Sequence, residues 1–248
     1  MFEYKVSVII PVYRGEKFIA KNLELIKQSL TTTFKNFEII CVIDGLVDNG
    51  LEEAKKVEGV KVLWSKNNLG KGAALKYGFE NSTGNFITFL DADMDIAPQE
   101  LKNFIPYMAT ADVVIGSKRH PFSKVKYPLI RRILSKGFQI CYLCILGLDL
   151  RDTQSGLKLI KREVLEIIIP LVMVKRYAFD LELCFLAHKH GFRIVEAPIK
   201  LDYKYAGSGV DVHAIINALL DTLAIRYRYT FLKYYQKKFH EEKFKNIK

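Results

Sequence analysis

Short apolar runs that alternate with stretches of helical spacing restrict the possible folds of this chain more than any other feature. The strand-like runs are residues 5–12, 37–43, 60–64, 85–90 and 112–116. The helical stretches between them are residues 16–30, 50–57, 70–80 and 98–108. Because strands and helices alternate, the pattern predicts an α/β fold with a mostly parallel sheet that helices cover on both faces.

The second half of the chain is less regular. It predicts helices over 127–148 and 179–190 and strands over 157–160 and 193–199. Residues 210–238 form one long helical pattern that becomes rich in Tyr and Lys. We therefore expect a domain over residues 1–209, followed by a basic, amphipathic helical tail over residues 210–248.

Length and composition restrict the class of protein further. A chain of 248 residues can bury a core without disulfide bonds. Its longest uncharged stretch, Gly137 to Leu148, has 12 residues, whereas a membrane-spanning helix needs roughly 20. The N-terminus has no signal-peptide pattern, and the four cysteines lie in apolar surroundings. We expect a cytoplasmic protein with reduced thiols.

The positive charge is concentrated in two segments. Residues 117–136 hold seven Lys or Arg and no acidic residue, and residues 226–248 hold eight against two Glu. The whole chain carries a net charge of +11, so the remainder is close to neutral. Local basic segments indicate an anionic partner such as phosphate groups or a membrane surface, although solvated helix faces would look the same. Nucleic acid is not expected, because its recognition motifs are missing.

Three carboxylates follow the fourth strand-like run, in the sequence FLDADMD. Ligands of parallel sheets bind outside the carboxyl ends of the strands, where Asp91, Asp93 and Asp95 stand. Carboxylates clustered in this way repel one another unless a cation offsets their charge. We predict a Mg²⁺ or Mn²⁺ site that also binds a diphosphate. The alternatives are an acidic turn or a calcium loop, but the Gly and Glu that a calcium loop needs are absent.

A glycine-rich, basic loop precedes the third helical stretch. Its sequence, NNLGKG over residues 67–72, places Lys71 at a helix N-terminus, which is suited to phosphate binding. It matches neither of the two common nucleotide-binding glycine motifs, so an ordinary loop remains the alternative.

Taken together, these motifs resemble glycosyltransferase family 2, the nucleotide-sugar enzymes of the GT-A fold. The similar segments are VSVIIPVY (6–13), VIDGLVDNG (42–50), NNLGKGAAL (67–75), FLDAD (89–93), IGSKR (115–119), RDTQSGLKL (151–159) and FDLEL (179–183). The RDTQSGLKL and RRILSKG segments look most like dolichyl-phosphate or polyprenyl-phosphate mannose and glucose synthases. The resemblance implies a Rossmann-like GT-A fold and an inverting hexosyltransferase.

The resemblance also implies roles for individual residues. The nucleotide sugar would contact Pro11, Tyr13, Asp44, Lys71, Asp91, Ala92 and Asp93. The metal ligands would be Asp91 and Asp93 of the DxD motif, with Asp95 as a further ligand. The acceptor phosphate would lie near Lys118, Arg119, Arg131, Ser135, Asp152 and Gln154. Asp93, Asp180 and Glu182 would be catalytic, the last two on the helix that closes the site. Asp180 or Glu182 could act as the base for a hydroxyl acceptor, and the alternative for each is a purely structural role, such as an ion pair with Arg176 or Arg193.

The sequence departs from the family pattern near the nucleotide. The family's DDGS is replaced by Ile43-Asp44-Gly45-Leu46, and Gly15 stands where an acidic residue is expected. The choice between uridine and guanosine therefore stays open. An arginine expected near Gly207 is also missing, and Lys204 is the candidate to replace it.

The chemistry of the acceptor separates the remaining hypotheses. A sugar hydroxyl needs a general base, whereas a phosphate monoester is already ionised at neutral pH and needs only positioning and countercharge. The basic segment 117–136 favours a dolichyl or polyprenyl phosphate over a hydroxyl acceptor. A non-catalytic GT-A-like module is a third hypothesis.

A lipid acceptor would bring the protein to a membrane. We predict that residues 231–239 (FLKYYQKKF) anchor it peripherally on the cytoplasmic face. The competing hypothesis is that this helix end packs on the domain.

Overall fold

The computed structural model describes residues 3–126, 129–175, 178–202 and 212–245. Within these ranges, side chains are described except those of residues 126, 131, 202, 212 and 243–245.

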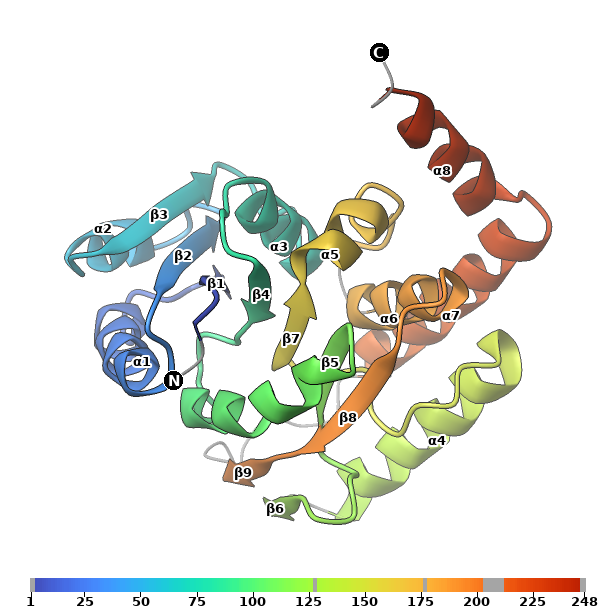
Figure 1. The fold of residues 1–248 in the computed structure, drawn as a ribbon, viewed down its shortest axis with the longest axis horizontal. Helices are drawn as coiled ribbons and strands as arrows, with labels where there is room; N and C mark the ends of the chain where they lie inside the picture. The colour runs from blue at the N-terminus through green and yellow to red at the C-terminus, as the bar shows by residue number, and fades with distance from the viewer. Residues whose placement is uncertain (1–2, 127–128, 176–177, 203–211, 246–248) are drawn as a thin grey trace.

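A seven-stranded sheet forms the centre of the molecule (Figure 1). Its strand order is β3-β2-β1-β4-β7-β5-β8. The strands are β1 (Val6–Val12), β2 (Phe37–Asp44), β3 (Val60–Ser65), β4 (Phe86–Phe89), β5 (Val113–Ser117), β7 (Lys158–Lys161) and β8 (Ile194–Pro198). β7 runs antiparallel to β4 and to β5, whereas the other neighbours pair in parallel. The predicted α/β class with a mostly parallel sheet is confirmed.

Helices cover both faces of this sheet, each over its own apolar core. One face carries α1 (Ile19–Thr33), α2 (Gly50–Lys55) and the 3-10 helices η1 (Pro98–Asn103) and η2 (Ile105–Ala109). The other carries α3 (Lys71–Glu80), α4 (Leu129–Leu146), α5 (Arg162–Ile168) and α6 (Phe179–Lys189). Side chains of β1 point alternately into the two cores: Val8 and Ile10 lie in the first, and Ile9 lies in the second. Burial on both sides explains why the strands read as continuous apolar runs.

Several elements differ from the expectation. Residues 98–108 were expected as one helical stretch, but η1 and η2 are two short 3-10 helices. The long helix expected over 210–238 is wrong as a single element. It divides into α7 (Val212–Thr230) and α8 (Tyr234–Lys245), with Lys233 at a φ of 48° between them. The short parallel pair of β6 (Lys124–Lys126) and β9 (Lys200–Asp202) was not predicted.

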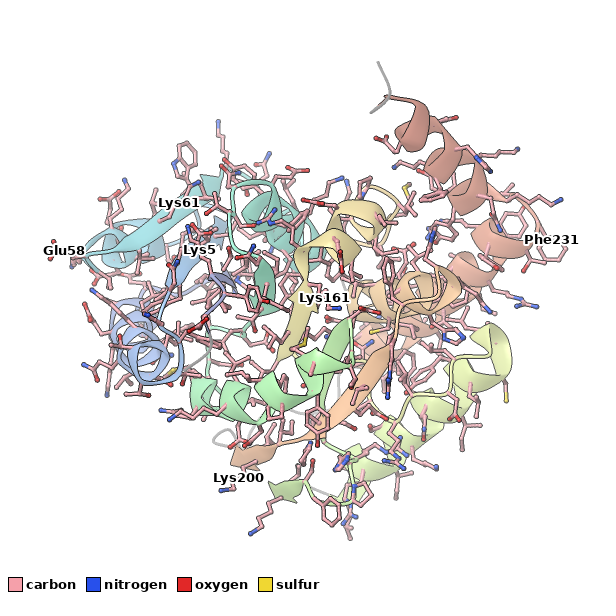
Figure 2. All side chains as sticks on the ribbon, viewed as in Figure 1. Lys5, Glu58, Lys61, Lys161, Lys200 and Phe231 are labelled. Carbon is pink, nitrogen blue, oxygen red and sulfur yellow. The ribbon has the colours of Figure 1, made fainter. Side chains whose placement is uncertain are left out.

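The two C-terminal helices pack against the body of the protein. Ile225 of α7 and Tyr235 of α8 are buried in the core that α6 also lines. Phe231, in the turn between the helices, points outward (Figure 2). The expected boundary at residues 209 and 210 lies outside the described residues, so the division into domain and tail stays a prediction. In the described part of the chain, the helices are all too short or too polar to cross a membrane.

Candidate active site

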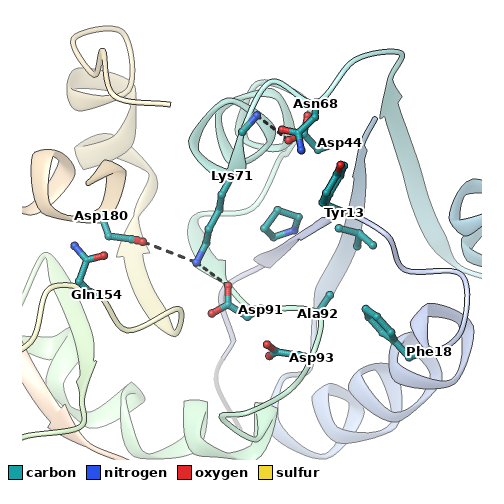
Figure 3. A pocket seen from close by; sticks show the side chains of 13 residues that line it. Tyr13, Phe18, Asp44, Asn68, Lys71, Asp91, Ala92, Asp93, Gln154 and Asp180 are labelled. Carbon is teal, nitrogen blue, oxygen red and sulfur yellow. Dashed lines mark hydrogen bonds and ion pairs between the residues drawn. The ribbon is translucent and has the colours of Figure 1, made fainter. Parts of the chain in front are cut away.

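A cavity of about 540 Å³ opens where β1, β2 and β4 end. Parallel strands direct their carboxyl ends to one edge of the sheet, and the residues that follow them meet there. The cavity contains all seven residues predicted to contact a nucleotide sugar (Figure 3). Its lining consists of Pro11, Val12, Tyr13, Phe18, Asp44, Asn68, Gly70, Lys71, Asp91, Ala92, Asp93, Gln154 and Asp180.

Asp44, the last residue of β2, holds the glycine-rich loop in place. Its carboxylate accepts hydrogen bonds from the backbone amides of Leu69 at 2.7 Å and Gly70 at 2.8 Å. Gly70 has a φ of +97°, a conformation that side chains disfavour, and α3 begins at the next residue. Because Asp44 fixes this turn, it fixes the starting point of Lys71.

Lys71 reaches between two carboxylates at the centre of the cavity (Figure 3). Its Nζ lies 2.7 Å from Asp91 Oδ1 and 3.8 Å from Asp180 Oδ2. Burial alone would lower the pKa of Lys71, but the Asp91 and Asp180 charges outweigh it and raise the pKa above its ordinary value. Lys71 is therefore a fixed positive charge in the cavity.

Lys158 continues this chain of alternating charges behind the cavity. The side chain is fully buried in β7, and its Nζ lies 2.6 Å from Asp180 Oδ1. Burial would raise the pKa of Asp180, but Lys158 and then Lys71 hold it below its ordinary value. Lys158 was not among the predicted site residues. Its signal in the sequence was a lysine inside a buried apolar strand, which needs a carboxylate partner.

Asp93 lies on the other side of Asp91 and has the electrostatics of a cation ligand. Burial, with the repulsion of Asp91 and Asp95, raises its pKa above the ordinary value. Among the described residues, no three acidic, histidine or cysteine side chains stand close enough together to hold a metal. Two carboxylates that face an open cavity do fit a Mg²⁺ or Mn²⁺ ion whose other ligands come from a diphosphate. The third ligand, Asp95, stays a prediction.

The loop 151–156 places the backbone of Gly156 against Asp91 and the side-chain amide of Gln154 in the first cavity. A Cβ on Gly156 would lie 1.7 Å from Asp91 Oδ2, so only glycine leaves room for this carboxylate. Gln154 lines the cavity, and its Nε2 is buried without a hydrogen-bond partner among the described residues. A buried donor in this state is suited to a ligand or water.

A second, larger cavity of about 940 Å³ lies beside α4. We call it the basic groove. Lys118 and Arg119, both predicted, line it together with His120, Arg132 and Lys136, which were not predicted individually. The signal for these three was their position in the basic segment 117–136. Leu129, Ile133 and Ile140 add an apolar wall.

Asp152, Gln154 and Ser135, which were also predicted to bind the acceptor, lie outside this lining. Asp152 is buried and accepts hydrogen bonds from the backbone amides of Lys118 and Gln154, each at 3.0 Å, so it shapes the loop. Ser135 offers its backbone carbonyl to Arg119 at 3.4 Å. The Arg131 side chain lies outside the described part of the structure.

A small cavity of about 90 Å³ lies between the two larger ones. Asp91 and Gln154 line both the small cavity and the first cavity, and Lys118 lines both the small cavity and the basic groove. The two larger cavities are therefore neighbours, with Asp91, Gln154 and Lys118 between them.

Glu182 does not reach either cavity. It is fully buried and lies two residues after Asp180 on α6, so it points to a different side of the helix. Its partners are Met173, Val174, Tyr235 and Arg228. We correct the expectation that Glu182 contacts the reacting groups.

The α/β fold, with its mostly parallel sheet, is GT-A-like. The chain belongs to glycosyltransferase family 2, because the model described as "Glycosyl transferase family 2" matches residues 7–168.

Named relatives match most of the chain. A dolichyl-phosphate beta-glucosyltransferase of Dictyostelium discoideum is 30% identical over 245 residues, covering 90% of this chain and 74% of the relative. One from Trichomonas vaginalis is 29% identical, covering 89% and 72%. Among solved structures, glucosyl-3-phosphoglycerate synthase from Mycobacterium tuberculosis with Mn²⁺, UDP and glucosyl-3-phosphoglycerate is similar in fold. It has a TM-score of 0.68 and 19% identity, and the match covers 90% of this chain and 80% of that chain.

Proposed function

We propose that this protein is a metal-dependent, inverting hexosyltransferase that moves glucose from a nucleotide sugar to a dolichyl or polyprenyl phosphate. The observation that carries the proposal is the juxtaposition of the acidic cavity with the basic groove, with Asp91, Gln154 and Lys118 between them. The choice of glucose comes from the relatives, which are named dolichyl-phosphate beta-glucosyltransferases.

The donor would lie in the first cavity. Tyr13, exposed at its mouth, offers a ring for the base, and Lys71 offers positive charge to the diphosphate. A divalent cation held by Asp91 and Asp93 would neutralise the charge that develops on the leaving diphosphate. Solved structures of the similar synthase contain UDP with Mg²⁺ or Mn²⁺, which supports this choice of cofactor.

The acceptor phosphate would enter from the basic groove. Lys118, Arg132 and Lys136 supply countercharge there, and Gln154 offers an amide donor nearer to Asp91. The phosphate oxygen is already ionised, so its attack on the anomeric carbon needs orientation and no proton acceptor.

The electrostatics of Asp180 favour this acceptor over a hydroxyl. Asp180 is the buried carboxylate nearest to Lys71, yet two lysines hold its pKa below the ordinary value. A general base works best with a pKa near the working pH, and a carboxylate stabilised in this way is a weak base. We therefore assign Asp180 to the placement of Lys71.

Membrane association follows from a lipid acceptor. α4 packs against α7, and both helices expose apolar side chains, including Leu129 and Ile133 on α4 and Leu220 and Leu223 on α7. Arg132 and Lys136 lie on the same α4 surface. An apolar surface with cations beside it fits an anionic bilayer. This surface replaces residues 231–239 as our proposed anchor, because Tyr234, Tyr235 and Phe239 in that segment pack on the core.

The direct test is transfer itself. The purified protein is incubated with UDP-glucose, GDP-mannose or other nucleotide sugars, Mg²⁺ or Mn²⁺, and a short polyprenyl phosphate. We expect metal-dependent appearance of glucose in the lipid phase with β configuration. Transfer to glycerol-type or sugar hydroxyls, with none to the lipid phosphate, would instead identify the alternative acceptor.

A further inference from the structure

Glu182, a buried side chain of α6, contacts both C-terminal helices. Its Oε2 accepts hydrogen bonds from the backbone amides of Met173 at 2.8 Å and Val174 at 2.7 Å. Its Oε1 accepts one from the Tyr235 hydroxyl of α8 and lies 3.5 Å from the Arg228 guanidinium of α7. Glu182 thus joins α7, α8 and the loop that precedes α6.

The same loop and the same helix support the donor cavity. The backbone carbonyl of Lys175 accepts a hydrogen bond of 2.9 Å from the amide of Gly72, the residue after Lys71. A Cβ on Gly72 would lie 2.4 Å from the Phe179 ring of α6, so this ring packs directly on the backbone of α3. The first turn of α3, and with it Lys71, is therefore seated on α6 and on this loop.

The buried charge of Glu182 depends on the partners that surround it. Burial raises the pKa of Glu182, which shows that its charge is costly in this position. Three hydrogen-bond donors and the charge of Arg228 offset that cost, and Tyr235 is itself 2% exposed. When one donor to a buried carboxylate is removed, the carboxylate loses compensation and its neighbours shift.

We propose that Glu182 and Tyr235 are positioning residues, through which the C-terminal helices hold Lys71 and Asp180 in donor-binding geometry. The proposal rests on the proposed function of the first cavity. Neither residue touches that cavity, so each acts through α6 and the loop before it. A displacement of about 1 Å at reacting groups can cost on the order of 100-fold in rate.

Two neighbouring tyrosines provide a matched test in the full-length protein. Tyr235→Phe removes the hydroxyl that binds Glu182, whereas Tyr234→Phe removes one that lies 3.0 Å from Met173 Sδ. Rates are measured with UDP-glucose, Mn²⁺ and a short polyprenyl phosphate. We expect Tyr235→Phe to lower kcat/KM for the donor about 10- to 100-fold and to leave the KM for the acceptor within about twofold. Tyr234→Phe should match the wild type.

Two substitutions of Glu182 remove its interactions to different extents. Glu182→Gln keeps an oxygen acceptor of the same shape, and Glu182→Ala removes it. We expect Glu182→Gln to retain more donor kcat/KM than Glu182→Ala does. The proposal is overturned if Tyr235→Phe lowers only Tm, or if the donor and acceptor constants change together.

A readout without turnover separates this proposal from the proposed function. If the wild type transfers no sugar from any donor, the proposed function fails, and amide hydrogen exchange still tests the network. We expect Tyr235→Phe to speed exchange at Gly72, Met173 and Val174 about tenfold or more, and Tyr234→Phe to leave it unchanged. Equal exchange in both variants at these amides would overturn the positioning role, whatever reaction the protein catalyses.

Discussion

At the scale of single residues, Asp93 tests the proposed metal site most directly. Burial and two neighbouring carboxylates raise its pKa, so its charge costs stability in the free protein. Asp93→Asn should therefore keep or raise Tm. It should also raise the activation free energy of transfer by roughly 3 kcal/mol, which lowers the rate about 100-fold or more. Initial rates at saturating Mn²⁺ and thermal unfolding measure the two effects.

Asp95→Asn is the comparison that defines the ligand set. A loss as large as that of Asp93→Asn would make Asp95 a third ligand, and a small loss would leave Asp91 and Asp93 as the pair. Near wild-type rates for Asp93→Asn would contradict the proposed site.

Gly156 is a second test at this scale. The methyl group of Gly156→Ala would overlap Asp91 Oδ2, which Lys71 holds at 2.7 Å through the other oxygen. The carboxylate must move, so we expect transfer to fall about tenfold or more and metal affinity to weaken. Gly156→Val should have a larger effect, and titration of Mn²⁺ binding measures it. Equal metal affinity in wild type and both variants would contradict this placement of Asp91.

At the scale of elements, Asp112 ties the three strands at one side of the sheet. Its carboxylate accepts hydrogen bonds from Lys161 Nζ at 2.8 Å and from the backbone amide of Arg193 at 2.9 Å. Burial would raise the pKa of Asp112, but Lys161 and Arg193 hold it below the ordinary value of 3.8. The stability it provides is therefore complete above that value and is lost as the pH falls through the folded-state pKa.

Asp112→Asn should accordingly lower Tm most near pH 7. The difference from wild type should shrink steadily from about pH 5 toward pH 3. Lys161→Met should show the same pH dependence, because it removes the partner. A difference in Tm that is constant across this range would contradict the ion pair.

The strands and most helices could be predicted because buried positions carry apolar residues, and their spacing is visible in the local sequence. β1, with Val8 and Ile10 facing one core and Ile9 the other, has an unbroken apolar run that only a doubly covered strand produces. The break at Lys233 could not be predicted, since the helical spacing of the sequence continues through it. After the break, α8 places Tyr235 against Glu182, a tertiary contact that local spacing does not encode.

In the candidate site, too, some residues could be predicted from the sequence, whereas some of their partners could not. Asp44, Lys71, Asp91 and Asp93 follow strands, and topology alone brings strand ends together. The partners of Asp180 and Glu182 depend on the rotation of α6, which places one toward Lys158 and the other toward Tyr235. Both residues fit the same sequence motif, and only the packed structure separates their roles.

At the scale of the whole molecule, the remaining question is how the protein would meet the proposed lipid acceptor. β3 lies at one end of the sheet, whereas α4 and α7 lie beyond its other end (Figure 1). The exposed apolar side chains of α4 and α7 and the cations of the basic groove thus lie far from β3. A docked molecule would present this end, with the basic groove, to the bilayer.

Vesicle flotation tests this orientation. The double change Leu220→Ser and Leu223→Ser removes apolar area that is more than half exposed and contributes little to the core. We expect the wild type to float with anionic vesicles at low salt and less at high salt, because each basic residue near the surface contributes about 1 kcal/mol. The double variant should lose most of this binding while Tm stays within a few degrees. Trp64→Ser is the matched control, since Trp64 on β3 is 49% exposed at the opposite end. If Trp64→Ser weakens binding as much as the α7 variant does, the proposed orientation is wrong.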